Sequence, residues 1–295
     1  MNKKIGFYGF RGNIEFAEMD LFNYDLLDNS NEKNKIFANF FEQLKNKKLE
    51  SSYDVREYML IYIQNISDSI IHCQLARKRN FNTYELDTYK IEERKTEDYP
   101  YINVFVDTIS QKFLIESKTR VFENPETCKK IIENIMSKTL MLKNAYISLN
   151  PITSEEKFWE KVEESKKVIS VEFNLNTPNW LTTANAATDL MKEIRKASGA
   201  DKAKLEFSNS QVGLELDKIG INSFVEYSSE GAGNWKIKYE DKVTGEKMIA
   251  KSKSKSKIIY VDLDSFDDDV ICSEISVMNI KKALDKIEKF ERFKN

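Results

Sequence analysis

The sequence is poor in glycine, proline and histidine, and each shortage excludes a class of site. Nine glycines and four prolines in 295 residues leave no Rossmann or P-loop glycine pattern, so neither kind of nucleotide-binding loop is expected. The single histidine, His72, lies in the apolar stretch "SIIHCQL". A histidine metal pair is therefore impossible, and a Ser/His/Asp relay would depend on this one residue. We interpret His72 as a hydrogen-bonded residue of a buried strand.

Cysteines and long apolar runs are also scarce. Cys73, Cys128 and Cys272 are far apart, odd in number and form no CxxC pair. This pattern suits a reducing compartment and excludes a thiolate zinc site, so we interpret all three as packing residues. No window has the uninterrupted run of about 18 apolar residues that a membrane span needs, and "MNKKIGFYGFRG" has no apolar signal-peptide core. We expect a cytoplasmic protein with no cofactor and no metal.

The charge that is present is nearly balanced. Hydrophobic residues make up 41% and charged residues 32% of the chain, and the formal net charge is -2. This composition is typical of a soluble globular protein, and the length allows one large domain or two ordinary ones. A slightly acidic chain argues against a nucleic-acid partner unless basic residues gather in a local patch.

The spacing of apolar residues predicts an α+β fold of mixed and antiparallel sheets with flanking helices. We expect a β-hairpin over residues 3–19, a helix over residues 31–48, and strands on both sides of a turn at residues 65–68. A hairpin should turn at residues 108–111. A further strand that begins near residue 83 is expected to run into a loop at residues 90–99, which are rich in charge. We place a domain boundary there, between a β-rich N-terminal domain (1–97) with one helix and a C-terminal α+β domain (98–295).

The C-terminal part of the sequence contains residues that are typical of helix starts and an apolar stripe that is typical of a helix face. Asn124 before Pro125 predicts an N-cap and first helical residue, and Thr153 with Glu156 predicts a capping box. The segment "GAGNWKIKYED" and the segment "EKMIAKSKSKSKIIYVD" are expected to form the last pair of strands. An amphipathic helix should close the chain, with one apolar stripe made by Ile280, Leu284, Ile287 and Phe290.

Lysines at every second position form the most unusual segment, "KSKSKSKIIYVDLDSFDDD". On a strand they would share one face, and alternating lysines of the preceding strand would extend the row. Such a row can bind backbone phosphates of a nucleic acid, or it can be the solvated face of an edge strand protected from aggregation. The residues alone leave both interpretations open. The candidate nucleic-acid-binding residues are Lys236, Lys238, Lys251, Lys253, Lys255 and Lys257.

An enzymatic alternative rests on three residues of "DTISQKFLIESK". Asp107, Glu116 and Lys118 fit the Asp…Glu-x-Lys arrangement of metal-dependent nucleases, in which two carboxylates hold Mg²⁺ and a lysine assists the attacking water. The pattern is short, and Asp107 is equally natural as a turn residue.

Residues 99–261 also resemble a family. Segments such as "NAYISLNPIT", "ISVEFNLNTPNW" and "GAGNWKIKYED" are similar to a bacterial family carried by prophages and defence loci and, more distantly, to RexA-like phage-exclusion proteins. The most distinctive positions look like turn and packing residues. They are Asn150, Pro151, Phe158, Trp159, Pro178 and Asn179.

The resemblance implies an α+β, RdgC-like architecture and a phage-defence role of the exclusion or abortive-infection type. It implies largely sequence-independent binding of double-stranded DNA, a homodimer, no catalytic residues, and a membrane-protein partner encoded nearby. The aromatic segments "GFYGF" and "YMLIYI" look exposed, which favours the same homodimer. A protein-interaction or toxin-regulating module without DNA binding remains the third interpretation.

Overall fold

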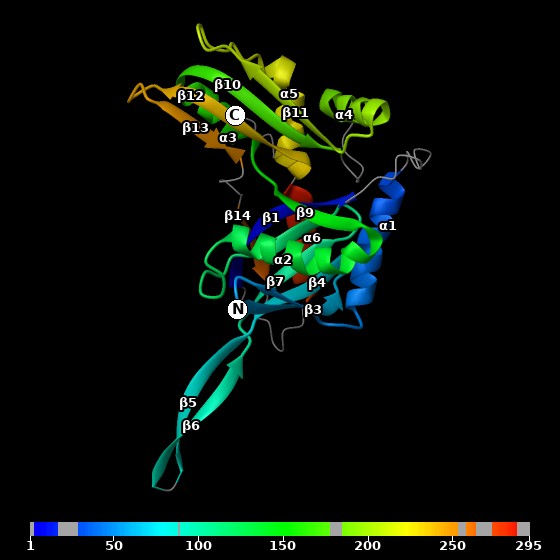
Figure 1. The fold of residues 1–295 in the computed structure, drawn as a ribbon, viewed down its shortest axis with the longest axis vertical. Helices are drawn as coiled ribbons and strands as arrows, with labels where there is room; N and C mark the ends of the chain where they lie inside the picture. The colour runs from blue at the N-terminus through cyan, green and yellow to red at the C-terminus, as the bar shows by residue number, and fades with distance from the viewer. Residues whose placement is uncertain are drawn as a thin grey trace.

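The computed structural model describes residues 3–16, 29–87, 89–177, 185–252, 258–263 and 273–287. It has an α+β fold with a large sheet, a small sheet and a two-stranded arm, and all strand pairs are antiparallel (Figure 1). The strands of the large sheet are β1 (Lys3–Phe16), β2 (Leu49–Tyr53), β3 (Arg56–Asn65), β4 (Ile70–Arg77), β7 (Tyr101–Asp107), β8 (Lys112–Glu116), β9 (Ala145–Pro151) and β14 (Ile258–Leu263).

Strand β1 organises the large sheet, whose order is β14-β1-β8-β7-β4-β3-β2, with β9 also paired to β1. The β-hairpin expected over residues 3–19 is wrong, because residues 3–16 form one continuous strand. This strand pairs with β14, β8 and β9 along successive parts of its length. Gly9 is not a turn residue: a Cβ at this position would overlap the side chain of Ile287, so glycine permits close packing here.

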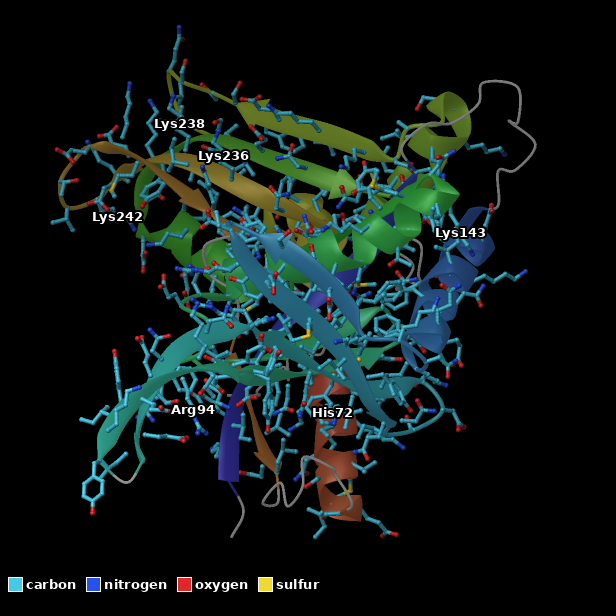
Figure 2. The ribbon with its side chains drawn as sticks, turned by 60° about the horizontal axis from the view of Figure 1, so that its bottom comes forward. His72, Arg94, Lys143, Lys236, Lys238 and Lys242 are labelled. Atoms are coloured by element: carbon cyan, nitrogen blue, oxygen red, sulfur yellow. The ribbon has the colours of Figure 1, made fainter. Side chains whose placement is uncertain are left out.

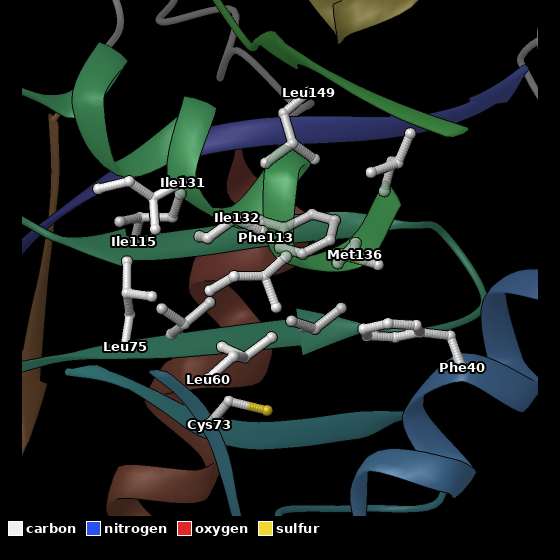
Figure 3. Packing of buried hydrophobic residues seen from close by; sticks show 14 of the residues in the cluster. Phe40, Leu60, Cys73, Leu75, Phe113, Ile115, Ile131, Ile132, Met136 and Leu149 are labelled. Carbon is white, nitrogen blue, oxygen red and sulfur yellow. The ribbon is translucent and has the colours of Figure 1, made fainter. Parts of the chain in front are cut away.

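Helices cover both faces of the large sheet. Helices α1 (Asn29–Leu44) and α2 (Pro125–Leu140) pack on one face, and α6 (Glu274–Lys286) packs on the other (Figure 1). Figure 3 shows how Ile131, Ile132 and Met136 of α2 meet Leu75 and Phe113 of the sheet. A short 3-10 turn, η1 (Met141–Lys143), follows α2.

Two of the predicted helix signals are confirmed on this sheet. The Asn124 side chain accepts a hydrogen bond of 2.8 Å from the Thr127 backbone N–H, and α2 begins at Pro125. Such an N-cap contributes about 1 kcal/mol. The stripe of α6 is confirmed for its described members, because Ile280, Leu284 and Ile287 are buried; Phe290 lies outside the described residues.

The large sheet continues across the boundary expected between residues 97 and 98. Strand β4 precedes that boundary and pairs with β7, which follows it, so the boundary does not separate two sheets. The charged loop expected at residues 90–99 is wrong, because it is mostly the strand β6 (Lys90–Asp98), paired with β5 (Arg79–Asp87). Because charged residues occupy both faces of this exposed ribbon, its sequence does not show the alternation of apolar and polar residues that indicates a strand.

The aromatic segments "GFYGF" and "YMLIYI", which were expected to be exposed, are largely buried. Phe7 and Phe10 are 0% and Leu60 is 2% exposed.

The small sheet has the order β11-β10-β12-β13 and lies at the end of the molecule opposite the arm (Figure 1). Helices pack against one of its faces, where Phe158 lies 5.3 Å from Trp235 and 5.9 Å from Phe173 between ring centroids. Its strands are β10 (Ser165–Asn176), β11 (Lys202–Ser208), β12 (Gly233–Asp241) and β13 (Lys247–Lys251). Its helices are α3 (Glu155–Glu164), α4 (Ala186–Ser198) and α5 (Lys218–Tyr227), followed by a π-helical turn, η2 (Ser228–Ala232).

The capping box expected from Thr153 and Glu156 is wrong. Ser154 is the N-cap of α3 and makes no side-chain capping bond, while the Thr153 backbone N–H donates to the Ser229 carbonyl instead. Thr153 thus joins β9 to η2 where the two sheets meet. None of the described helices is both long and apolar enough to cross a membrane.

Candidate nucleic-acid interface

One face of the small sheet is left uncovered by helices. Along β10, Val171, Phe173 and Leu175 are buried toward the helices, whereas Glu172 and Asn174 alternate with them and point the other way. We call this second side the open face. Lys236 and Lys238 of β12 belong to it and lie far from the arm, which carries Arg94 (Figure 2).

The open face carries an excess of positive charge. Cross-strand register places the members, because residues directly opposite each other share a face: Glu172 lies opposite Lys236, which lies opposite Lys251. Its ionisable residues are the lysines Lys167, Lys202, Lys204, Lys236, Lys238, Lys247 and Lys251 and the glutamates Glu172, Glu206 and Glu240. Seven lysines against these three glutamates, with Glu15 of β1 lying 2.6 Å from Lys202, leave an excess of three positive charges. The whole chain, in contrast, has a formal net charge of -2.

The structure brings three of the six predicted lysines together. Lys236, Lys238 and Lys251 lie on the open face, while Lys253, Lys255 and Lys257 lie outside the described residues. The last pair of strands differs from expectation, because β13 ends at Lys251 and β14 joins β1 in the large sheet. The described lysines therefore gather across strands rather than along one strand.

Four lysines of the open face were missed in the sequence. Lys202 and Lys204 alternate in "KAKLEFS", Lys247 begins β13, and Lys167 lies opposite Glu240 near the start of β10. The alternation in β11 is a usable signal for one polar face. The pairing of β11 with β10, which places these lysines beside β12, is not local in the sequence.

Glu172 is an internal counterion at the centre of this face. Its Oε2 lies 3.1 Å from Lys204 Nζ and 3.9 Å from Lys236 Nζ, and its Oε1 accepts a hydrogen bond of 2.8 Å from Asn174 Nδ2. The hydrogen bond from Asn174, and then the one from Lys204, lower the pKa of Glu172. The carboxylate therefore stays ionised at neutral pH, and a bound anion has to compete with it for two lysines.

A hollow of about 280 Å³ lies beside Glu172 on the open face. Its lining combines two lysine ammonium groups with side-chain amides, groups that can donate hydrogen bonds to a phosphate. The lining residues are Glu172, Asn174, Asn234, Trp235, Lys236 and Lys251. Lys238 projects beyond this hollow and is exposed, and within the described ranges it forms no ion pair.

The residues of the nuclease pattern do not converge. Asp107 pairs with Lys112 at the turn end of the β7–β8 hairpin and accepts hydrogen bonds from Ile109 and Ser110. Glu116 lies at the other end, four residue pairs or roughly 13 Å away, and accepts bonds of 2.9 and 2.8 Å from the Asn103 backbone and side chain. Two carboxylates so far apart cannot share one Mg²⁺.

His72 and the described cysteines are packing residues, as the sequence predicts. His72 is fully buried, with Nε2 2.8 Å from Asn103 Oδ1 and its ring centroid 4.8 Å from that of Phe105. Cys73 and Cys128 are buried thiols, and burial raises the pKa of Cys128 to about 12. Cys272 lies outside the described residues. Over the described part of the chain, no group of three or more His, Cys, Asp or Glu side chains could hold a metal ion.

Comparison with protein-family models and with curated proteins finds no match for this chain. The RexA-like resemblance and the RdgC-like architecture therefore remain predictions from the sequence. The geometry of the open face stands independently of both.

Proposed function

We propose that this protein binds double-stranded DNA through the open face of the small sheet, largely without sequence specificity, and acts without catalysis in phage defence. The observation that carries the proposal is the excess of three positive charges on one uncovered sheet face of an acidic chain. Local charge of this kind attracts a polyanion even when the net charge of the protein does not.

The spacing of the lysines suits a phosphate backbone. Lys236 and Lys238 are two residues apart on β12, which separates their Cα atoms by about 7 Å, and neighbouring strands add rows about 5 Å to each side. Each phosphate contact by a lysine releases condensed counterions from the DNA, and this release drives binding. Affinity therefore falls steeply as salt is added.

The residue types favour positioning on the backbone over reading of bases. Lysine is a flexible point charge, whereas base edges are read by the planar forks of Arg, Asn or Gln. No arginine occurs on the open face among the described strands, and Asn174 is already hydrogen-bonded to Glu172. The proposed contact is therefore tolerant of sequence.

The biological role rests on the resemblance over residues 99–261. In this proposal the protein is a cytoplasmic homodimer that responds to phage DNA and acts with a membrane-protein partner encoded nearby, as in exclusion or abortive infection. The DNA contact and the defence role are separable, because the first depends on the open face and the second on the family pattern.

Gel shifts with random-sequence duplex DNA at several salt concentrations, with and without Mg²⁺, test the proposal. The variant K236Q/K238Q/K251Q is expected to flatten the slope of log K against log salt by roughly two to three, at about 0.9 per phosphate contact. The variant K253Q/K255Q/K257Q tests the other predicted lysines in the same way. A control, K47Q/K130Q/K192Q, makes the same charge change at exposed lysines outside the open face.

Equal affinity and an equal slope for the parent and K236Q/K238Q/K251Q would refute DNA binding by the open face. Absence of any DNA binding by the parent would favour the protein-interaction interpretation. Mg²⁺-dependent cleavage of the duplex that is lost in Glu116→Gln would contradict the non-catalytic role. We expect no cleavage with either Mg²⁺ or Mn²⁺.

A further inference from the structure

The arm formed by β5 and β6 extends away from the rest of the molecule (Figure 1). Its nine consecutive residue pairs, from Arg79 opposite Asp98 to Asp87 opposite Lys90, have no register shift. The ribbon is therefore about 30 Å long. Polar cross-strand bonds hold it together, among them the 3.0 Å bond between the hydroxyls of Thr83 and Thr96. A two-stranded ribbon with nothing packed on it is only marginally stable in water.

The outer end of the arm is apolar. Tyr84, Leu86 and Ile91 share one face of the ribbon, because Leu86 lies opposite Ile91 and Tyr84 is two residues from Leu86. Their exposed fractions are 69%, 77% and 67%, and Tyr89 in the turn is 96% exposed. Large apolar side chains gathered at the end of a projecting ribbon contribute nothing to the core and are typical of a docking surface.

The charge of the arm argues against a nucleic-acid partner. Residues 79–98 contain six acidic and four basic residues, an excess of two negative charges. Arg94 is already engaged at 2.8 Å with Glu85, and Lys90 at 3.6 Å with Glu92. A β-ribbon fits the major groove of DNA in size, but an acidic ribbon is repelled by the phosphates on both sides of that groove. The arm needs a partner surface that is apolar and basic.

Helix α6 presents such a surface on the side that faces away from the large sheet. A groove of about 490 Å³ is lined by Glu274, Ile275, Val277, Met278 and Lys281. Ile275 and Met278 are 55% and 46% exposed. The exposed lysines of this helix continue the groove toward its C-terminal end. They are Lys281, Lys282 and Lys286, and with the exposed acidic residues Glu274 and Asp285 they leave the helix an excess of one positive charge.

We infer that the end of the arm of one copy docks into the α6 groove of a second copy of this chain, and that the second arm does the same in return. The two surfaces are complementary in apolar character and in charge, yet they do not meet within one chain, because the arm extends away from the body that carries α6 (Figure 1). Their contact must then be made between chains. Reciprocal exchange closes a two-fold dimer and doubles the buried area of a small contact. This assembly is independent of DNA binding.

Light scattering coupled to gel filtration, on the full chain without DNA and over a range of concentrations, provides the first test. The parent is expected to be a dimer in the micromolar range, and L86E/I91E is expected to weaken dimerisation at least a hundredfold. The control V212E/V243E places the same charges at exposed apolar positions outside the arm and α6, and it is expected to remain a dimer. Circular dichroism checks that every variant stays folded.

A charge exchange tests the partner surface. K281E/K282E is expected to weaken the dimer at least tenfold, because the introduced glutamates repel the acidic arm. Adding E92K/E93K to the same chain is expected to restore most of the lost affinity. A photo-reactive benzophenone at position 86, in a mixture of isotope-labelled and unlabelled copies, is expected to cross-link to residues 274–286 of the other copy.

Three results would overturn the inference. If the parent protein stays monomeric even at 100 times the micromolar concentration at which a dimer is expected, the dimer is excluded. Cross-links from position 86 to the arm or to another surface of the second copy would establish a different dimer. Cross-links to added duplex DNA, or a charge exchange that restores nothing, would contradict the proposed complementarity.

Discussion

The large sheet and the small sheet differ in how much of their surface is covered. Helices pack on both faces of the large sheet, and the five central residues of its strand β7 are all buried. Helices pack on one face of the small sheet, and its strand β10 alternates between buried and partly exposed residues. A strand covered on both faces has no side chain to present to a partner. Of the two sheets, it is therefore the small one whose open face has side chains available to a partner.

Phe113→Ala should cause the largest loss in the free energy of unfolding, because this residue lies in the core of the covered large sheet. Phe113 is 1% exposed, and its ring centroid lies 5.9 and 6.3 Å from those of Phe37 and Phe41 of α1. Removing a buried phenyl ring leaves a cavity that costs about 3–5 kcal/mol. Urea unfolding should show this loss, whereas Lys238→Gln on the open face should change the free energy of unfolding by less than about 0.5 kcal/mol. A loss below about 1 kcal/mol for Phe113→Ala would show that this core is loosely packed.

Lys112→Met should give a pH-dependent effect of intermediate size, because the large sheet buries this charge instead of exposing it. Lys112 is 4% exposed, and burial, followed by the nearby Arg11, lowers its pKa to about 8. An unfolded lysine has a pKa of about 10.4, so between pH 8 and 10 the unfolded chain holds a proton that the folded chain has released. The free energy of unfolding of the parent should then rise across this range by up to about 3 kcal/mol.

Lys112→Met should lack that rise, and the matched exposed substitution Lys130→Met should retain it. Urea unfolding at pH 7, 8, 9 and 10 measures the difference between the two variants. If the free energy of unfolding changes with pH in the same way in both variants, Lys112 keeps its proton in the folded chain.

Glu172→Gln should have the smallest effect on the free energy of unfolding, because this residue lies on the open face. The substitution should change DNA binding instead. It removes the carboxylate that lies 3.1 Å from Lys204 and 3.9 Å from Lys236. Affinity for random duplex DNA should rise about two- to fivefold, the range of an exposed ion pair of up to roughly 1 kcal/mol. Gel shifts at fixed salt measure this change, with Glu193→Gln on α4 as the control of equal charge. Unchanged or weaker binding by Glu172→Gln would mean that the DNA does not contact these two lysines.

Local signals in the sequence predicted the elements better than their partners. The helix expected over residues 31–48, the Asn124 cap and the described part of the α6 stripe follow from neighbouring residues, and the structure confirms them. The single strand β1 was not predicted, because its length depends on three partners distant in the sequence. The arm was predicted only in its first strand, because the exposed strand β6 has no apolar period and was expected to be a loop.

The open face was predicted only in part, again because the strands that form it are distant from one another in the sequence. Alternation indicates that Lys236 and Lys238 share a side, but it cannot indicate that Lys204 and Lys251 lie beside them, because that depends on the strand order. The separation of Asp107 from Glu116 likewise depends on the register of the β7–β8 hairpin. Register is set by tertiary packing and by turn geometry together.

The pairing of β1 with β14 has a consequence for biosynthesis. Lys3 and Leu263 are partners, so the first strand of the sheet has to wait for a segment about 260 residues later. At about 5–20 residues per second, a ribosome needs roughly 13–50 s to make that stretch. Contacts of such high sequence separation also slow the final folding step. During this interval one edge of β1 lacks its partner β14, and an unpaired strand edge is prone to pair with other chains and aggregate.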